Sequence, residues 1–354
     1  MTLEKKIKSE AIILMITSFN QLYNFLSYFS EKKLISNKKI YLTIFSDHIP
    51  EKLISQMMKY IEKFTAVEII DMRRKSINYK IKFIKYFYYY FFVLKKIFEI
   101  KKFFNISSIS VSGRIQIPIL CFLSFFSSSK LYFMEDGVGE YVPWAKKGQK
   151  PFLLLFYLWN KFLKINKSRV RILQLAKSRT EYFKNLNQPF LREEYYYDNR
   201  KFYKNFIKNN FEKQLSFEPK CILIGTNPIH KNTISEENNF NYLKNLYVET
   251  LSEVKKRYSY SKDEILFFPH PRTKLHYRDN LTESLYDYSN IHTISSIIVE
   301  HYLNHKNLEI VIGSMSSALY YAKTLFNREH VYYLDNEMEL QQDGELKNLL
   351  NTFK

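Results

Sequence analysis

The sequence predicts an α/β protein made of two Rossmann-like, doubly wound domains. Short apolar segments rich in β-branched residues alternate with longer amphipathic segments, which is the pattern of βα units with parallel strands. The alternation stops over residues 176–218, where Lys, Asn and Tyr are dense, and then resumes. The 354 residues suffice for two domains of roughly 100–200 residues each. We therefore expect an N-terminal domain over residues 1–175, a helical connector over 176–218 and a C-terminal domain over 219–354.

Apolar runs define the expected strands of each half. In the first half these are residues 11–17, 40–45, 67–70, 106–112, 130–134 and 169–175. In the second half they are residues 221–225, 265–268, 291–294, 309–312 and 330–334. The start of the chain is expected to lead into the first strand and not to be a signal peptide, because Glu4 and Glu10 interrupt its basic residues. No apolar run reaches the ~20 residues that cross a bilayer, so no transmembrane helix is expected.

The chain is strongly basic. Lys and Arg number 54 against 35 Asp and Glu, which gives a net charge of +19. A charge of this size indicates a polyanionic neighbour, and the candidates are nucleic acid, an anionic membrane surface and phosphorylated or acidic sugars. Cys121 and Cys221 lie far apart within apolar runs, so both are expected to be reduced core residues of a cytoplasmic protein.

Residues 72–104 combine ten basic side chains with a dense run of aromatic ones, and Glu99 is the only acid among them. This mixture favours a segment that lies on an anionic membrane surface with its rings at the interface. A partly buried helix pair with solvated lysines and a surface for single-stranded nucleic acid are the alternatives. We expect the membrane surface, and no nucleic acid.

The ends of the predicted strands carry the candidate functional residues, because parallel sheets bind ligands at the carboxyl ends of their strands. The chain has only seven glycines, and four of them, Gly113, Gly137, Gly225 and Gly313, stand at or just beyond such an end. Turns from strand to helix favour glycine for structural reasons as well. The grouping is therefore more informative than any single glycine.

The first candidate is Glu135-Asp136-Gly137, directly after the predicted strand 130–134. Adjacent carboxylates repel each other, which raises the pKa of one of them toward the range of a general base. A solvated turn is the structural alternative, because acids and glycine are ordinary turn residues.

The second candidate is His270, which lies between Pro269 and Pro271 after the predicted strand 265–268. The prolines restrain its backbone, and Arg272 adds a positive charge that favours an anion such as a phosphate. An imidazolium there can donate a proton to that anion. The alternative is a histidine that only closes a strand.

The third candidate is a predicted helix N-terminus after the strand 309–312, lined by Gly313, Ser314, Ser316 and Ser317. Such an N-terminus binds anions readily, although serine caps are also purely structural in many proteins. It lacks the Lys of a P-loop and the spacing of a dinucleotide fingerprint. A related turn of Gly225, Thr226 and Asn227 opens the second half and is expected to face the same crevice.

Together, Glu135-Asp136-Gly137, His270-Pro271 and Ser316-Ser317 resemble the three signatures of bacterial sialyltransferases. An acidic-acidic-Gly, a His-Pro and a Ser/Thr motif are shared by the lipooligosaccharide sialyltransferases (glycosyltransferase family 52) and the capsular polysialyltransferases. The match covers the order and spacing of the motifs and not the overall sequence. The resemblance implies a GT-B fold, in which two Rossmann-like domains face a central cleft and the C-terminal one holds CMP-sialic acid.

The resemblance also implies an inverting transfer of sialic acid from CMP-sialic acid to a hydroxyl of lipooligosaccharide or capsule. Asp136, or alternatively Glu135, would deprotonate the acceptor hydroxyl, and His270 would protonate or hydrogen-bond the departing phosphate. The expected substrate-binding residues are Gly137, Gly225, Thr226, Asn227, Pro271, Arg272, Gly313, Ser314, Ser316 and Ser317.

No metal or other cofactor is expected. The leaving group is a nucleoside monophosphate, and the sequence contains no D-x-D motif for chelating a diphosphate through a metal. His301 and His305 have the i,i+4 spacing of a zinc pair, but the Glu of a zinc-protease motif is missing between them.

Two alternatives stay open. The first is a GT-B glycosyltransferase that uses another nucleotide sugar and transfers a hexose or Kdo. The second is a non-enzymatic basic protein that binds a membrane or another polyanion. For the enzyme, the expected partners are CMP-sialic acid and a lipid-linked glycan acceptor, with peripheral association at the inner face of the cytoplasmic membrane.

Overall fold

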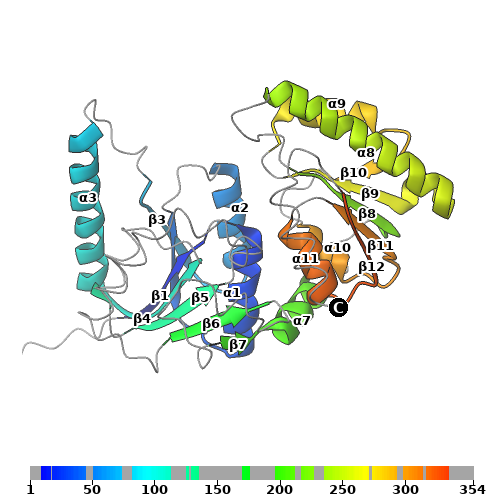
Figure 1. The fold of residues 1–354 in the computed structure, drawn as a ribbon. Coiled ribbons are helices and arrows are strands. Elements are labelled where there is room, and N and C mark those ends of the chain that lie inside the picture. Colours follow the sequence, from blue (N-terminus) through cyan, green and yellow to red (C-terminus); the bar gives the residue numbers. More distant parts are fainter. Residues whose placement is uncertain are drawn as a thin grey trace, which may run out of the picture. The chain divides into compact units, whose positions relative to one another are not determined.

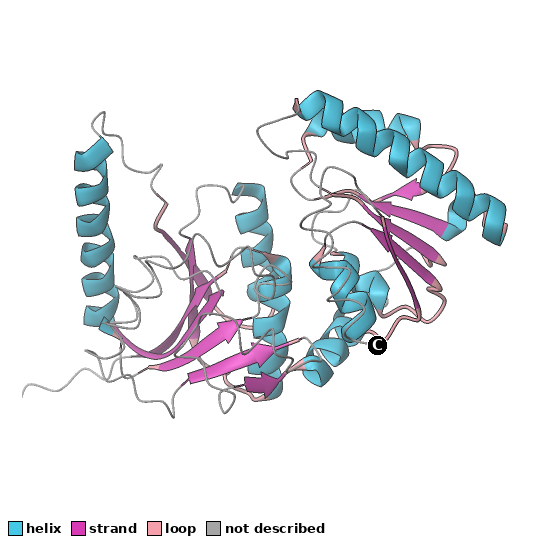
Figure 2. Ribbon diagram, in the orientation of Figure 1, coloured by secondary structure: helices cyan, strands magenta, loops and turns pink. Residues whose placement is uncertain are grey.

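Two compact α/β units make up the chain, one from the described residues up to Tyr203 and one from those after it. The structure, a computed structural model, describes residues 9–16, 18–44, 51–73, 82–112, 125–126, 129–134, 170–175, 196–211, 217–226, 235–270, 273–292, 298–313 and 316–334. Each unit contains one parallel sheet with helices on both of its faces (Figures 1 and 2). None of the described helices is both long and apolar enough to cross a bilayer.

Unit 1 has a doubly wound sheet. Its strands are β1 (Ser9–Met15), β2 (Lys39–Ile44), β3 (Val67–Asp71), β4 (Phe104–Ser112), β5 (Lys130–Met134), β6 (Val170–Gln174) and β7 (Tyr196–Asp198). They lie in the order β3-β2-β1-β4-β5-β6-β7, so the direction of winding reverses between β1 and β4. Helices α1 (Phe19–Glu31) and α2 (Glu51–Ile61) lie on one side of the sheet and α3 (Lys82–Phe103) on the other (Figure 1).

Both faces of the unit 1 sheet are covered by apolar residues, which explains the unbroken apolar runs of its central strands. Residues 11–15 of β1 are all buried, and so are residues 131–134 of β5. The inner face of α3, with Val93, Ile97 and Ile100, packs into the same core as Ala11 and Ile13 of β1. On the other side, Ser18 caps α1, because its Oγ accepts the backbone N–H of Gln21 at 3.3 Å.

The expected connector contains a strand that the sequence analysis missed. We predicted only helix and loop over residues 176–218, yet β7 pairs in parallel with β6 and extends the first sheet. Asn199, which follows β7, is fully buried and donates from Nδ2 to the Oδ1 of Asn24 at 2.7 Å and to the Oγ of Ser27 at 2.9 Å. Asn24 donates in turn to the carbonyl oxygen of Leu173 at 3.1 Å. A buried polar network therefore joins β7 to α1 and β6.

Unit 2 repeats the doubly wound pattern with five described strands. They are β8 (Cys221–Ile224), β9 (Ile265–Phe268), β10 (Asn290–Ile291), β11 (Ile310–Gly313) and β12 (His330–Tyr333), in the order β10-β9-β8-β11-β12. Helices α8 (Glu236–Tyr258) and α9 (Leu275–Ser284) lie on one face, and α10 (Val299–Leu303) and α11 (Ser317–Thr324) on the other (Figure 1). Helix α7 (Arg200–Phe211) begins in unit 1 and ends in unit 2.

The central strands of unit 2 are completely buried, as expected for a sheet with helices on both faces. Cys221 of β8 is a free, fully buried residue, and burial raises the pKa of its thiol to about 12. This confirms the expectation that Cys221 is a reduced core residue. Cys121 lies outside the described residues.

Candidate functional site

The carboxyl ends of three neighbouring strands in unit 2 bring several of the predicted site residues to one edge. Gly313 of β11 is in register with Ile224 of β8, and Ile224 is in register with Phe268 of β9. Gly225 directly follows β8, and His270 comes two residues after β9. The winding reverses between β8 and β11, and such a switch point is where doubly wound sheets bind ligands.

His270, Gly225 and Thr226 line one small cavity at this edge. Its volume is about 10 Å³, which is room for roughly one water molecule. The rest of its lining is mostly apolar and comes from α8, β9, α9 and the loop before α9, through Phe240, Leu243, Tyr247, Phe267, Thr273 and Leu281. The structure thus places two of the predicted motifs, the glycine turn after β8 and the histidine after β9, around the same space.

Close packing requires glycine at two of these positions. A Cβ on Gly225 would lie 3.0 Å from Cζ of the Phe267 ring. A Cβ on Gly313 would lie 3.1 Å from the Cβ and 3.2 Å from the carbonyl oxygen of Ile224. Both glycines are buried, so close packing at the strand ends is a structural reason for glycine at each position.

Tyr247 holds the turn after β8, and the sequence analysis did not identify it. Its hydroxyl oxygen accepts the backbone N–H of Thr226 at 2.8 Å, while its ring packs at 5.0 Å against that of Phe267. The backbone N–H of Gly225 donates to the carbonyl oxygen of Phe268 at 2.9 Å. The turn is therefore fixed to both α8 and β9.

The loop that carries His270 is fixed on its far side. The backbone N–H of Thr273 donates to the carbonyl oxygen of His270 at 2.9 Å. Lys274 Nζ lies 2.6 Å from a carboxylate oxygen of Glu236, in the first turn of α8, and this contact raises the pKa of Lys274. His270 itself is partly exposed, so a ligand at this edge can reach its imidazole. Pro271 and Arg272 lie outside the described residues.

The predicted helix N-terminus after β11 is present. Ser316 is the N-cap of α11, and its Oγ accepts the backbone N–H of Ala318 at 3.2 Å. This is the structural capping role that the sequence left open. Ser317 is the first residue of the helix, and Ser314 lies outside the described residues.

The acidic motif belongs to unit 1. Glu135, Asp136 and Gly137 lie outside the described residues, as does Asn227 of the second half. They directly follow Met134, the buried last residue of β5. Since β5 pairs in parallel with β4 and β6, the motif starts at the carboxyl end of an inner strand, as the sequence predicts.

A buried group of titratable residues lies next to this edge of unit 2 and was also missed. The ring of His292, directly after β10, stacks on that of Phe268 at 4.1 Å, and the ring of Tyr302 meets it edge-on at 5.8 Å. In α10, burial raises the pKa of Glu300 to about 7. Burial, and to a lesser degree the nearby His292, lowers the pKa of His301 to about 3. The signal for this group was a Glu-His pair within the apolar run of residues 297–303.

His301 and His305 have different environments. The ring of His301 stacks on that of Phe211 at 3.7 Å, whereas Nε2 of His305 lies 3.4 Å from a carboxylate oxygen of Glu218. Among the residues that the structure describes, no three His, Cys, Asp or Glu side chains cluster as a metal site would require.

Comparison with known proteins gives the fold a name. No protein-family model and no curated protein sequence matches the chain. Its structure is similar to the GT-B domain of a sialyltransferase from Photobacterium damselae, with a TM-score of 0.50 and 14% identity over 88% of this chain and 87% of that chain. It is also similar to a candidate UDP-N-acetylglucosamine 2-epimerase from Listeria monocytogenes, with a TM-score of 0.52 and 11% identity over 94% and 81%.

A third similar structure is that of S. aureus MnaA with UDP, with a TM-score of 0.50 and 12% identity over 92% of this chain and 79% of that chain. At such low identity the likeness shows the fold and not the activity. The chain therefore has an α/β fold of the GT-B type with a parallel, doubly wound sheet in each unit, which confirms the predicted fold class.

Proposed function

We propose that this protein is a GT-B glycosyltransferase with a nucleotide-sugar donor and, more specifically, an inverting sialyltransferase that uses CMP-sialic acid. The observation that carries the proposal is the meeting of His270 with the Gly225–Thr226 turn at the carboxyl edge of the unit 2 sheet. This is where nucleotides bind in doubly wound folds, and a histidine there provides a proton donor for a phosphate. The three sequence motifs and the likeness to a sialyltransferase GT-B domain support the choice of donor.

The donor side of the reaction is assigned to unit 2. As the bond between the anomeric carbon and the phosphate oxygen breaks, negative charge develops on the phosphate of CMP. The imidazolium of His270 donates a hydrogen bond or a proton to it, and the N-terminal N–H groups of α11 add further donors. Lys274 is already engaged with Glu236, so it serves mainly to position the His270 loop.

The acceptor side is assigned to the acidic motif of unit 1. Asp136, or alternatively Glu135, removes the proton of the acceptor hydroxyl as its oxygen bonds to the anomeric carbon from the face opposite the phosphate. The configuration at that carbon inverts as the reaction passes through an oxocarbenium-like state. The acceptor in this proposal is a lipid-linked glycan.

The similar structures also support a second candidate, an enzyme that binds a UDP-sugar. One of them is described as a UDP-N-acetylglucosamine 2-epimerase, and another contains UDP. This candidate shares the fold and the nucleotide edge with the first. It differs in the nucleotide that it requires.

Calorimetric titration with CMP, UMP and UDP, without added divalent metal, separates the candidates. Selective CMP binding that weakens at least about tenfold in His270→Ala supports the sialyltransferase. The matched control is His276→Ala, because His276 is an exposed histidine of α9 that does not line the cavity, and this variant should bind CMP normally. Preference for UDP would favour the UDP-sugar enzyme. If the folded protein bound no nucleotide, a polyanion-binding protein without enzymatic activity would become the leading explanation.

A further inference from the structure

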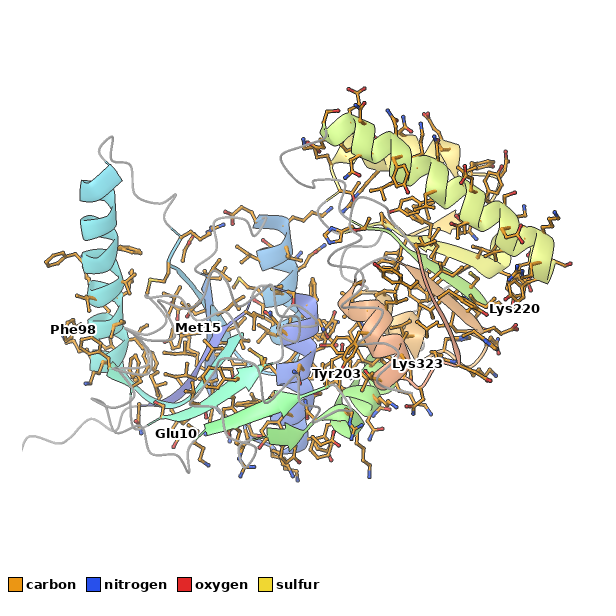
Figure 3. All side chains as sticks on the ribbon, viewed as in Figure 1. Glu10, Met15, Phe98, Tyr203, Lys220 and Lys323 are labelled. Carbon is orange, nitrogen blue, oxygen red and sulfur yellow. The ribbon has the colours of Figure 1, made fainter. Side chains whose placement is uncertain are left out.

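The outer face of α3 exposes a row of large aromatic rings. Phe91 and Phe98, which lie on one face of the helix, are 58% and 57% exposed, and Phe103 at the end of the helix is 59% exposed. The opposite face of the helix, with Val93, Ile97 and Ile100, is buried in the core. Helix α3 therefore has apolar side chains on two sides, and among the described residues those on the outer side stay more than half exposed. Figure 3 shows Phe98 on the side of α3 that is turned away from the sheet.

Lysines share this outer face with the rings. Phe91, Lys95, Phe98 and Lys102 follow one another at intervals of four, three and four residues, which places them along one stripe of a helix. Lys95 and Lys102 are exposed. Glu99, the one acid of α3, pairs with Lys96 at 2.9 Å and also lies in the field of Lys95, but the helix has six lysines against this single acid.

Neighbouring contacts hold the rings and lysines in place without covering them. The ring of Phe98 packs edge-on against that of Phe125 at 5.2 Å. The Nζ of Lys102 lies 5.5 Å from the centre of the Phe103 ring, and that of Lys101 lies 5.9 Å from the centre of the Phe125 ring. The surface that a partner meets is thus an ordered set of alternating rings and cations.

This chemistry fits the interfacial region of an anionic bilayer. Large exposed apolar patches on folded proteins mark interaction surfaces. Aromatic rings are stable at the depth of lipid headgroups, and lysines beside them keep their charged ends among the phosphates. A single-stranded nucleic acid fits less well, because proteins bind it in a basic groove, whereas this surface is the outer flank of one helix.

We propose that the outer face of α3 binds anionic membrane surfaces, with Phe91 and Phe98 inserted at headgroup level and Lys95, Lys101 and Lys102 against the lipid phosphates. The proposal does not depend on the enzymatic activity of the protein. It predicts binding that requires both the rings and the lysines and that weakens with salt.

Co-sedimentation of the full chain with vesicles tests the lysines. We expect binding to vesicles of phosphatidylglycerol and phosphatidylethanolamine and little binding to phosphatidylcholine alone. Each lysine near an anionic surface contributes about fivefold, so Lys95→Glu with Lys102→Glu should weaken binding at least about twentyfold. The charge-matched control is Lys208→Glu with Lys256→Glu, two exposed lysines of α7 and α8, and it should change binding far less.

Two further variants test the rings. Phe91→Ser with Phe98→Ser should weaken binding about tenfold, while Tyr286→Ser, which removes a ring that is 63% exposed in unit 2, should leave it unchanged. Phe98→Trp should bind vesicles normally. Lipids that are brominated near the headgroup should quench the fluorescence of the added tryptophan. Tyr286→Trp should show no such quenching. Thermal unfolding of each variant establishes that it is folded.

Three outcomes would overturn the proposal. One is equal binding by the α3 variants and their controls, which would mean that the net charge of the chain binds the vesicles. Another is an unquenched tryptophan at position 98 on bound vesicles. The last is that the parent protein does not bind vesicles and instead dimerises through this face or prefers single-stranded DNA.

Discussion

The two units share a strand order around their switch points but differ in the residues at the carboxyl ends of their strands. In unit 2, the buried Gly225 follows the central strand β8, and it lines a small cavity together with the partly exposed His270. In unit 1, β1 leads into Ile16, which is only 2% exposed. After the central strand of its sheet, unit 2 thus has a buried glycine beside a partly exposed histidine, whereas unit 1 has a buried isoleucine.

The described cations near the two edges are paired with carboxylates in both units. Arg73, which follows β3 in unit 1, donates from Nε to Asp71 at 2.8 Å and lies 2.7 Å from a carboxylate oxygen of Glu51. These carboxylates raise the pKa of Arg73, so its charge is neutralised within the protein. Lys274 in unit 2 is likewise paired with Glu236, at 2.6 Å, so the partly exposed His270 is what favours unit 2 for the proposed anionic donor. In the proposed function, the residues at the strand ends, and not the shared topology, divide the chemistry between the units.

The largest expected effect is a loss of turnover in the variant Asp136→Asn of unit 1. Loss of a general base typically lowers turnover ~10²–10⁴-fold. CMP binding should stay within about twofold of normal, because the proposed nucleotide site lies in unit 2. The measurements are CMP release from CMP-sialic acid and calorimetric CMP binding.

Glu135→Gln is the matched variant for this prediction. Normal turnover in Asp136→Asn together with a loss in Glu135→Gln would exchange the roles of the two acids. Normal turnover in both variants would show that the general base does not belong to this motif, and would contradict the proposed role of unit 1 in proton removal.

A smaller effect concerns the stability of unit 2 and its dependence on pH. Burial raises the pKa of Glu300 from an ordinary value near 4.5 to about 7. The native state therefore binds more protons than the unfolded state between these pH values, and the free energy of unfolding falls as the pH rises through that window. His301, whose pKa is lowered to about 3, has the opposite effect on the free energy of unfolding below about pH 6.5. This effect cancels when the parent protein is compared with a variant that keeps His301.

Glu300→Gln isolates the contribution of the carboxyl group. The variant should match the parent near pH 5 and exceed its stability at pH 8 by up to roughly 3 kcal/mol. Urea unfolding at the two pH values measures this difference. A constant difference at both pH values would show that Glu300 does not titrate as its burial implies.

The smallest effect concerns the glycines of the unit 2 edge. Gly313→Ala places a Cβ 3.1–3.2 Å from atoms of Ile224, which lies in the fully buried strand β8 and cannot readily move. We expect a loss of about 1–2 kcal/mol in the free energy of unfolding. Gly225→Ala meets only the outer end of the Phe267 ring at its closest point and should cost less. A larger loss of stability in Gly225→Ala than in Gly313→Ala would show that strand β8 adjusts more easily than the Phe267 ring.

Sequence reasoning located the strands well, because β-branched apolar runs with helical segments between them are a local signal. Every strand that it predicted is present, although only part of the run expected at 291–294 is described as β10. Strand β7 was missed, since its three residues are polar or aromatic and form a strand only by pairing with β6. The candidate site was predicted in part: His270, Gly225 and Thr226 meet as expected, whereas Tyr247 was not foreseen.

The sequence by itself determined the class of fold, the positions of most strands and the residues at their ends, because these depend on hydrophobic period and on glycine and proline. Only the tertiary structure decided which of those residues meet and which face of each helix is used. Tyr247 reaches Thr226 across 21 positions of the chain, and α3 buries Val93 while exposing Phe91 and Phe98. Such choices depend on contacts between segments far apart in the sequence, and apolar composition alone does not specify which apolar face turns toward the sheet.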